Sequence, residues 1–287
     1  MWHEKIWKLI RKTVDAWIEH RGPSRGAALA FYTIFSISPI LIIMTSVAGF
    51  FLGDKAVQNA VLEKSRIVIG NAGTSVVGSI LRAKPNAASS FLAAAAGLVA
   101  MLMGSTNVFI ELKDALDQIW KVEGKKAGGI RSFVRTRLLS LLITLVMTLL
   151  IMVSILFSAV VQEIAKIGGS FVSEHTVLLG GLNFTFLFAM TMALFATIYK
   201  VLPSASIEWK DVWIGAGITS ILFVISKTLI AIYLLHSAAV SLFGAAGSLI
   251  VLLFWVYYSA QIFLLGAEFT KVYAQYLGSR SRAEEKG

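Results

Sequence analysis

Cysteine is absent from the 287-residue chain. Its absence excludes disulfides, thiolate zinc sites, iron–sulfur clusters and a cysteine nucleophile, and it leaves the redox compartment open. Charge is also scarce: 15% of the residues are charged and 57% are hydrophobic, whereas an ordinary soluble domain has about 25% charged residues. Mean hydropathy is +0.77. This composition excludes a disordered chain and argues against a soluble enzyme.

The motifs of several enzyme classes are absent as well. The chain has no Gly-x-x-x-x-Gly-Lys-Ser/Thr loop, no Gly-x-Gly-x-x-Gly after a strand and no His-Glu-x-x-His. Its histidines are far apart in sequence: His3, His20, His175 and His236. We therefore expect no ATP hydrolysis, no metal site, no cofactor and no catalytic residue.

Long uncharged runs dominate what is present, and about 20 apolar residues suffice for a helix to cross a bilayer. The run from Thr228 to Ala267 is too long for one crossing, and we divide it where serine and glycine cluster, between His236 and Gly247. The fold class predicted is all-α, a polytopic membrane protein with six transmembrane helices within residues 26–268. The spans are near 26–53, 85–110, 138–162, 176–199, 212–235 and 247–268, followed by a tail over 269–287.

Lysine and arginine are distributed unevenly between the two sides of this topology. The side that holds both termini carries 19 of them and the opposite side 6, and the side with the excess is normally cytoplasmic. We expect a bacterial inner-membrane protein with both ends in the cytoplasm. The net charge of +10 needs no nucleic-acid partner, because the basic residues are spread over four segments that also hold 12 acidic residues.

Residues 1–22 form a predicted amphipathic helix at the membrane interface. Its apolar residues recur every three or four positions, and Gly22 and Pro23 end it. Packing of this helix on the other helices is the alternative. Basic residues here and after the second span are candidates for binding anionic lipid headgroups, although they would also serve to fix the topology alone. They are Lys5, Lys8, Arg11, Lys12, Lys125, Lys126, Arg131, Arg135 and Arg137.

The segment from Asp54 to Lys84 is the longest predicted outer loop. The spacing of its apolar residues from Val57 to Val68 suggests a short amphipathic helix near the surface. A solvated connector fits the pattern equally well.

Ionisable and polar side chains inside the spans are candidates to line a substrate pathway. Lys227 lies in the outer half of the fifth span, where it could also extend to the headgroups. The sixth span ends with Tyr257, Tyr258, Gln261 and Glu268, and the spacing of seven residues puts Gln261 and Glu268 close to one face. An aromatic belt, and a pair between Glu268 and a loop arginine, are the alternative interpretations.

Two weaker groups complete the candidate pathway. Asn107 and Glu111 share a face at the inner end of the second span, where hydrogen bonding between helices is the alternative. In the first span, Tyr32 stands before Pro39, which should kink the helix and free backbone carbonyls.

Four segments together resemble the YihY/BrkB family of bacterial inner-membrane proteins. They are Arg25 to Pro39, Leu112 to Trp120, Leu202-Pro203 with Trp209 and Asp211, and Phe254 to Glu268. The resemblance covers nearly the whole chain and implies six transmembrane helices with both ends cytoplasmic. Members have carried the label ribonuclease BN, a virulence label and proposals of lipid or solute transport.

Three functions compete at this stage. The chain could be a transporter that moves a small solute or lipid, passively or coupled to an ion gradient, with Glu268 or Glu111 carrying the proton. It could instead be a scaffold that organises lipid without transport. A ribonuclease would need a cytoplasmic cluster of carboxylates, histidines or a metal, which the short cytoplasmic segments lack. Expected partners are membrane lipids, an unidentified substrate and, in a homo-oligomer, further copies of the chain.

Overall fold

The computed structural model describes residues 2–82, 108–121, 176–236 and 247–279, with residue 281 and separate positions between 146 and 161. Regular structure in these residues is entirely helical, which agrees with the predicted all-α class. A further helix covers residues 108–119. The named helices are α1 (Trp2–Glu19), α2 (Gly22–Leu52), α3 (Asp54–Arg82), α7 (Thr176–Val201), α8 (Trp209–His236) and α10 (Gly247–Tyr276).

Three of the described helices are long and apolar enough to cross a membrane. Their candidate spans are Gly180–Val201, Trp209–Ile230 and Leu249–Tyr276, which correspond to the fourth, fifth and sixth predicted spans. The first predicted span falls within α2. The predicted spans near 85–110 and 138–162 lie mostly outside the described residues, so the number six stays a prediction.

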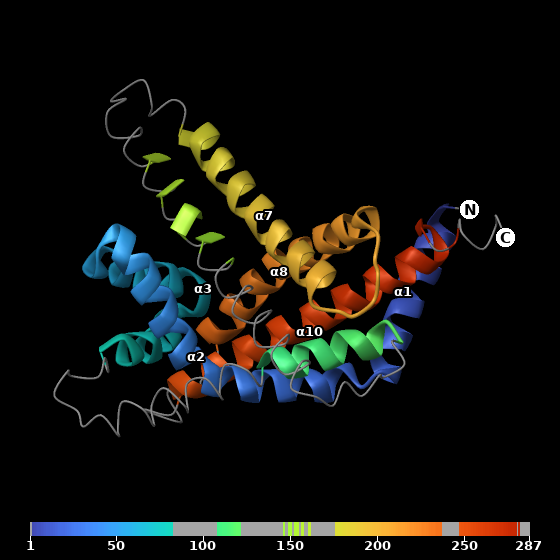
Figure 1. Ribbon diagram of the computed structural model, residues 1–287, viewed down its shortest axis with the longest axis horizontal. Coiled ribbons are helices and arrows are strands. Elements are labelled where there is room, and N and C mark those ends of the chain that lie inside the picture. Colours follow the sequence, from blue (N-terminus) through green and yellow to red (C-terminus); the bar gives the residue numbers. More distant parts are fainter. Residues whose placement is uncertain are drawn as a thin grey trace.

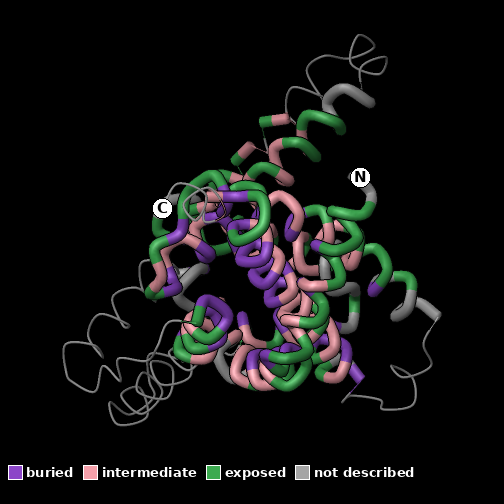
Figure 2. The backbone as a smooth tube through the Cα atoms, turned by 90° about the vertical axis from the view of Figure 1, so that its right-hand side faces the viewer, coloured by how far each residue is buried: buried purple, intermediate pink, exposed green. Residues whose placement is uncertain are grey.

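Helix α10 is the centre of the arrangement. It packs against α8, α2, α1 and α3, and α7 packs against α8 (Figure 1). Buried residues gather along the middle of the bundle, whereas its outer surface is largely exposed (Figure 2). Helices α1 and α3 lie at opposite ends of the bundle, and α10 ends beside α1 (Figure 1).

Helices α8 and α10 approach each other at two glycines. Gly215 of α8 lies against the hydroxyl of Thr270, and Gly266 of α10 lies against the hydroxyl of Thr219, so a side chain at either glycine would overlap a threonine. Small residues at a helix contact let the backbones pack closely inside a membrane, where the hydrophobic effect between helices is weak.

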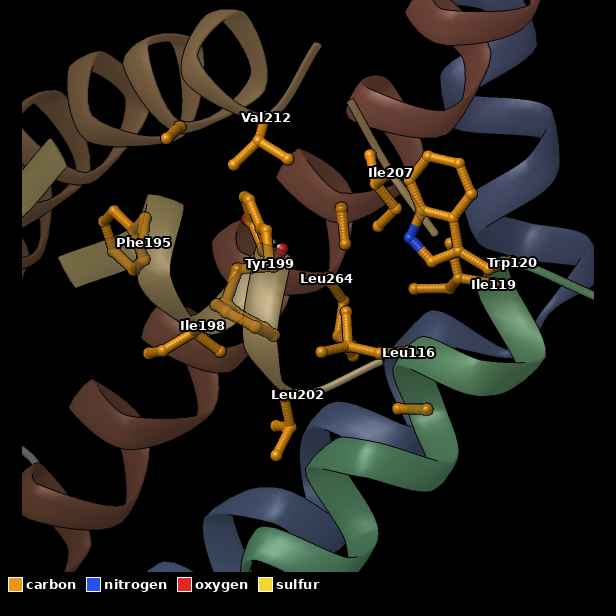
Figure 3. Close-up of a cluster of buried hydrophobic side chains, with 14 of the residues drawn as sticks. Leu116, Ile119, Trp120, Phe195, Ile198, Tyr199, Leu202, Ile207, Val212 and Leu264 are labelled. Atoms are coloured by element: carbon orange, nitrogen blue, oxygen red, sulfur yellow. Dashed lines mark hydrogen bonds between the residues drawn. The ribbon is translucent and has the colours of Figure 1, made fainter. Parts of the chain in front are cut away.

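Tyr199 connects α7 to this pair of helices. Its hydroxyl donates to the Phe263 carbonyl at 2.8 Å and lies 3.0 Å from the Thr219 hydroxyl. Around it, side chains of α2, α7, α8, α10 and the helix over 108–119 form the main core, in which Trp120 lies beside Ile207 (Figure 3). The core therefore joins five helices, and Trp17 of α1 packs against it.

The helix expected from Val57 to Val68 is present, as part of the longer helix α3. It extends from Asp54 to Arg82 and packs on α2 and α10, so the solvated connector is wrong. It also folds back on itself: the Ser65 hydroxyl lies 3.2 Å from that of Thr74, and Leu62 contacts Gly78. A straight helix would separate the last two residues by about 24 Å. Apolar packing explains the helix, because Val57, Val77 and Leu81 are buried.

Candidate functional site

A histidine and a glutamate that are 248 residues apart meet at the junction of α1, α2 and α10. The Nδ1 atom of His20 lies 2.5 Å from Oε1 of Glu268. Both residues are buried, with 9% of His20 and 1% of Glu268 exposed. Glu268 belongs to the candidate span Leu249–Tyr276. A carboxylate inside such a helix is energetically costly. Where one occurs, it usually has a partner or marks a functional site.

The turn between α1 and α2 places His20 against α10. Arg21 has a left-handed backbone with φ of 54°, and the His20 amide donates to the Ala16 carbonyl at 2.9 Å. Gly22 follows and lies against the indole of Trp17, so any larger residue there would collide with the ring. The sequence therefore makes a tight turn at His20 and fixes its position.

The second carboxylate oxygen of Glu268 has a different environment. Oε2 is buried and accepts no hydrogen bond from the residues that the structure describes. Lys271, one turn further along α10 and only 6% exposed, attracts the carboxylate, whereas Glu19 repels it. One oxygen is thus held by an imidazole, and the other is a buried acceptor that no described residue uses.

Gln261 lies two turns before Glu268 and faces the same segment of the chain. Its amide Nε2 donates to the Pro23 carbonyl at 3.3 Å. Gly26 lies directly against this amide and leaves no room for a side chain of its own. The amide oxygen Oε1 is buried and has no donor among the described residues. Gln261 therefore presents a second unused acceptor near the start of α2.

An ion pair connects the same segment to the helix over 108–119. Arg25 Nη1 lies 3.8 Å from Oε1 of Glu111, and each side chain is about a quarter exposed. Three predicted site residues, Glu111, Gln261 and Glu268, thus contact residues 20–26. We call this set, with His20 and Arg25, the junction cluster.

Lys227 lies far from the junction cluster in the fold. It is half-buried on α8, beside α3, and its positive charge repels that of Lys64. Burial lowers the pKa of Lys64 below its usual value. The nearby carboxylate of Glu63 opposes this shift, and the charge of Lys227 adds to it. Glu268 does not pair with Lys227: its ion-pair partner among the described residues is His20.

The aromatic candidates do not join the junction cluster. Tyr32 is half-buried on α2, with its ring edge-on to Phe31 at 5.7 Å. The rings of Tyr257 and Tyr258 are 5.4 Å apart, and Tyr258 is 40% exposed. Pro39 falls within α2, which continues on both sides of it. The side chain of Pro39 and all of Asn107 lie outside the described residues.

The basic candidates for lipid headgroups separate into two groups. Lys5, Lys8 and Lys12 line a pocket of about 210 Å³ with Tyr276, whose hydroxyl accepts a hydrogen bond from Lys12. Arg11 lies outside this pocket, 3.9 Å from Asp15 on the exposed side of α1. The others lie outside the described residues: Lys125, Lys126, Arg131, Arg135 and Arg137.

Sequence reasoning missed three members of this environment: His20, Arg25 and Lys271. His20 gave no signal beyond its place at a helix end, because its partner is distant in sequence. Lys271 stands three residues after Glu268, and that helical spacing could have indicated the interaction. Within the described ranges, no three histidine, aspartate or glutamate side chains are grouped to hold a metal ion.

Comparison with known proteins gives one family and several bacterial relatives. The family described as Virulence factor BrkB matches residues 13–287. A Bacillus subtilis (strain 168) protein named as ribonuclease-like protein YfkH is 25% identical over 90% of this chain and 92% of its own length. UPF0761 membrane proteins of Janthinobacterium sp. (strain Marseille) and Chromohalobacter salexigens are 26% and 24% identical over 88% and 99% of this chain. No solved structure matches.

The chain spans 56% and 66% of the lengths of the two UPF0761 proteins. The family match nevertheless covers nearly all of this chain, and its apolar helices agree with the membrane proteins named among the relatives. The chain therefore belongs to the BrkB family and is a bacterial membrane protein of a group without a defined catalytic activity.

Proposed function

We propose that the chain is a transporter of the inner membrane that moves a small solute or lipid with protons and without ATP hydrolysis. The buried pair of His20 and Glu268 at one end of an apolar span is the observation that supports this proposal most. Ionisable residues at such positions commonly mark substrate or proton pathways.

The chemistry of the pair suits proton transfer. Histidine changes its charge near neutral pH more readily than any other side chain. A proton can move between Nδ1 of His20 and Oε1 of Glu268, which are already at hydrogen-bond distance. The second oxygen of Glu268 can then exchange a proton with water or substrate, since no described residue donates to it.

The proposal includes an orientation. With six crossings and both chain ends in the cytoplasm, the junction cluster lies at the cytoplasmic end of the bundle. The folded helix α3 and Lys227 then lie towards the outside. A substrate that crosses between the two ends would pass along α10, which contacts both α1 and α3.

Uptake by proteoliposomes tests transport itself. The purified full chain is reconstituted without ATP, and an inward proton gradient is imposed. Labelled citrate, glutamate, glycerol 3-phosphate and a fluorescent phospholipid are offered in separate samples. We expect at least one to enter faster than in empty liposomes and a protonophore to abolish the difference. Uptake equal to that of empty liposomes for all four would contradict the proposal.

A lipid-organising scaffold is the second candidate, and one feature of α1 favours it. Leu9 and Thr13 of α1 are buried in the bundle, whereas Trp7 and Ile18 are 69% and 60% exposed. The exposed apolar residues form one stripe: Ile6, Trp7, Ile10, Val14 and Ile18. Such a stripe suits the interfacial position that the sequence predicted.

The lysine pocket lies on the other flank of α1. At 3.6 residues per turn, Lys5, Lys8 and Lys12 fall roughly opposite the stripe. A bilayer that covers the stripe therefore leaves these lysines facing the cytoplasm, which weakens their assignment to lipid headgroups. Lipid contact by α1 then rests on the stripe, and it is compatible with transport as well as with a scaffold.

A further inference from the structure

The fold of α3 creates a polar groove. Helix α3 lies at the end of the bundle remote from α1 (Figure 1). The groove has a volume of about 710 Å³, which is large enough for a small organic solute. Among the described residues, its lining comes from α3 alone, and most of these side chains are polar. They include Asn59, Glu63, Arg66, Asn71, Thr74 and Arg82.

Two guanidinium groups lie on this groove because α3 folds back. Arg66 precedes the bend and Arg82 ends the helix, and contacts of Ser65 with Thr74 and of Leu62 with Gly78 hold the two halves together. Among the residues that the structure describes, neither arginine has a carboxylate within 4 Å. Their charges are therefore not neutralised by an ion pair, although Glu63 lines the same groove.

Two lysines add positive charge at this end of the bundle. Lys64 is half-buried on α3, where the neighbouring Glu63 attracts it and Lys227 of α8 repels it. The Lys64 amine donates to the Ser154 hydroxyl at 3.5 Å. Helix α3 carries four basic side chains and two acidic ones, Asp54 and Glu63. With Lys227 beside it, this end of the bundle has a net positive charge, which attracts anions.

We propose that the groove binds a small hydrophilic solute through its carboxylate or phosphate group, held by Arg66 and Arg82. Guanidinium groups bind both oxyanions with paired, charge-assisted hydrogen bonds. Asn59, Asn71 and Thr74 supply hydrogen bonds for the hydroxyl or amine groups of the same solute. The inference rests on the proposed function in one respect: the groove is the outer binding site for the transported substrate.

Equilibrium dialysis tests binding without requiring transport. The full chain is placed in nanodiscs of zwitterionic phospholipid, so that no anionic headgroup competes. Labelled citrate, glutamate, inorganic phosphate and glycerol 3-phosphate are the probes, two of them carboxylates and two phosphates. We expect at least one to bind, and Arg66→Gln and Arg82→Gln each to weaken its affinity about tenfold to a hundredfold.

Two further variants make the result specific. Arg11→Gln removes an exposed arginine from the opposite end of the bundle and should leave the affinity unchanged. Arg66→Lys keeps the charge but loses the paired geometry, so it should bind more weakly than the native chain and more tightly than Arg66→Gln. It also serves as the folded comparison if a glutamine variant is unstable.

The inference is overturned if none of the four probes binds, or if both glutamine variants bind as tightly as the native chain. These outcomes are separable from failure of the transport proposal. If binding requires both arginines but no probe is taken up, the binding site is supported and the transport proposal is rejected. If uptake is unchanged in both arginine variants, the transport proposal is supported and the binding site is rejected.

Discussion

His20 and Glu268 connect the turn between α1 and α2 to the C-terminal part of α10. Their side-chain atoms lie 2.5 Å apart although 248 residues separate them. The contact attaches α1 to α10 near the point where Lys12 also reaches Tyr276. The same pair is therefore positioned both to hold α1 in place and to carry a proton.

Removal of either partner should destabilise the bundle, because the remaining group stays buried without its match. We expect His20→Ala to lower the free energy of unfolding by about 3–5 kcal/mol. The double variant His20→Ala, Glu268→Gln should lose less than the sum of the two single losses, by roughly 1–3 kcal/mol. Unfolding in mixed micelles measures this cycle, and strictly additive losses would show that the two side chains do not interact.

Glycine-to-alanine substitutions test the close approach of α8 and α10. Gly215→Ala and Gly266→Ala each insert a methyl group against a threonine hydroxyl, and we expect losses of about 1–3 kcal/mol in unfolding free energy. Gly180→Ala is the matched control, since it lies in α7 with open space around it. There the better helix propensity of alanine should give a gain of up to about 1 kcal/mol. Equal effects at all three positions would refute the close approach.

The position of α1 can be measured directly because the chain has no native cysteine. Single cysteines replace Ile10 in the exposed stripe and Lys8 on the lysine flank, and each carries a spin label in bilayers. We expect the label at position 10 to be more accessible to oxygen, which concentrates in lipid. The label at position 8 should be more accessible to a water-soluble nickel complex. The reverse order, or equal accessibility, would place α1 away from the interface.

Several features of the fold follow from the sequence alone. Uncharged runs predicted α7, α8 and α10 to within a few residues at most ends, because length and hydropathy decide which segments suit a bilayer. The spacing of seven residues between Gln261 and Glu268 correctly put them on one face, and both contact residues 20–23. Helical periodicity is a local property, and local patterns are visible in a sequence.

Features that depend on distant contacts were not predictable. The partner of Glu268 is His20 and not a loop arginine, since pairing at this range is set by how α1 docks on α10. The fold of α3 likewise depends on burial of Val77 and Leu81 against Leu252 and Val256 of α10. In α1, Leu9 is buried and Ile10 is exposed, a division that one amphipathic pattern does not reveal.

Proton movement across proteoliposomes tests the central claim most directly. A pH-sensitive dye is trapped inside, a substrate identified by the uptake assay is added outside, and the lumenal pH is followed. The native chain and the exposed-site control Glu4→Gln should acidify the lumen at equal rates, and Glu268→Gln should lower the rate at least about tenfold. Undiminished acidification by a folded Glu268→Gln variant would contradict the role of the buried pair in proton transfer.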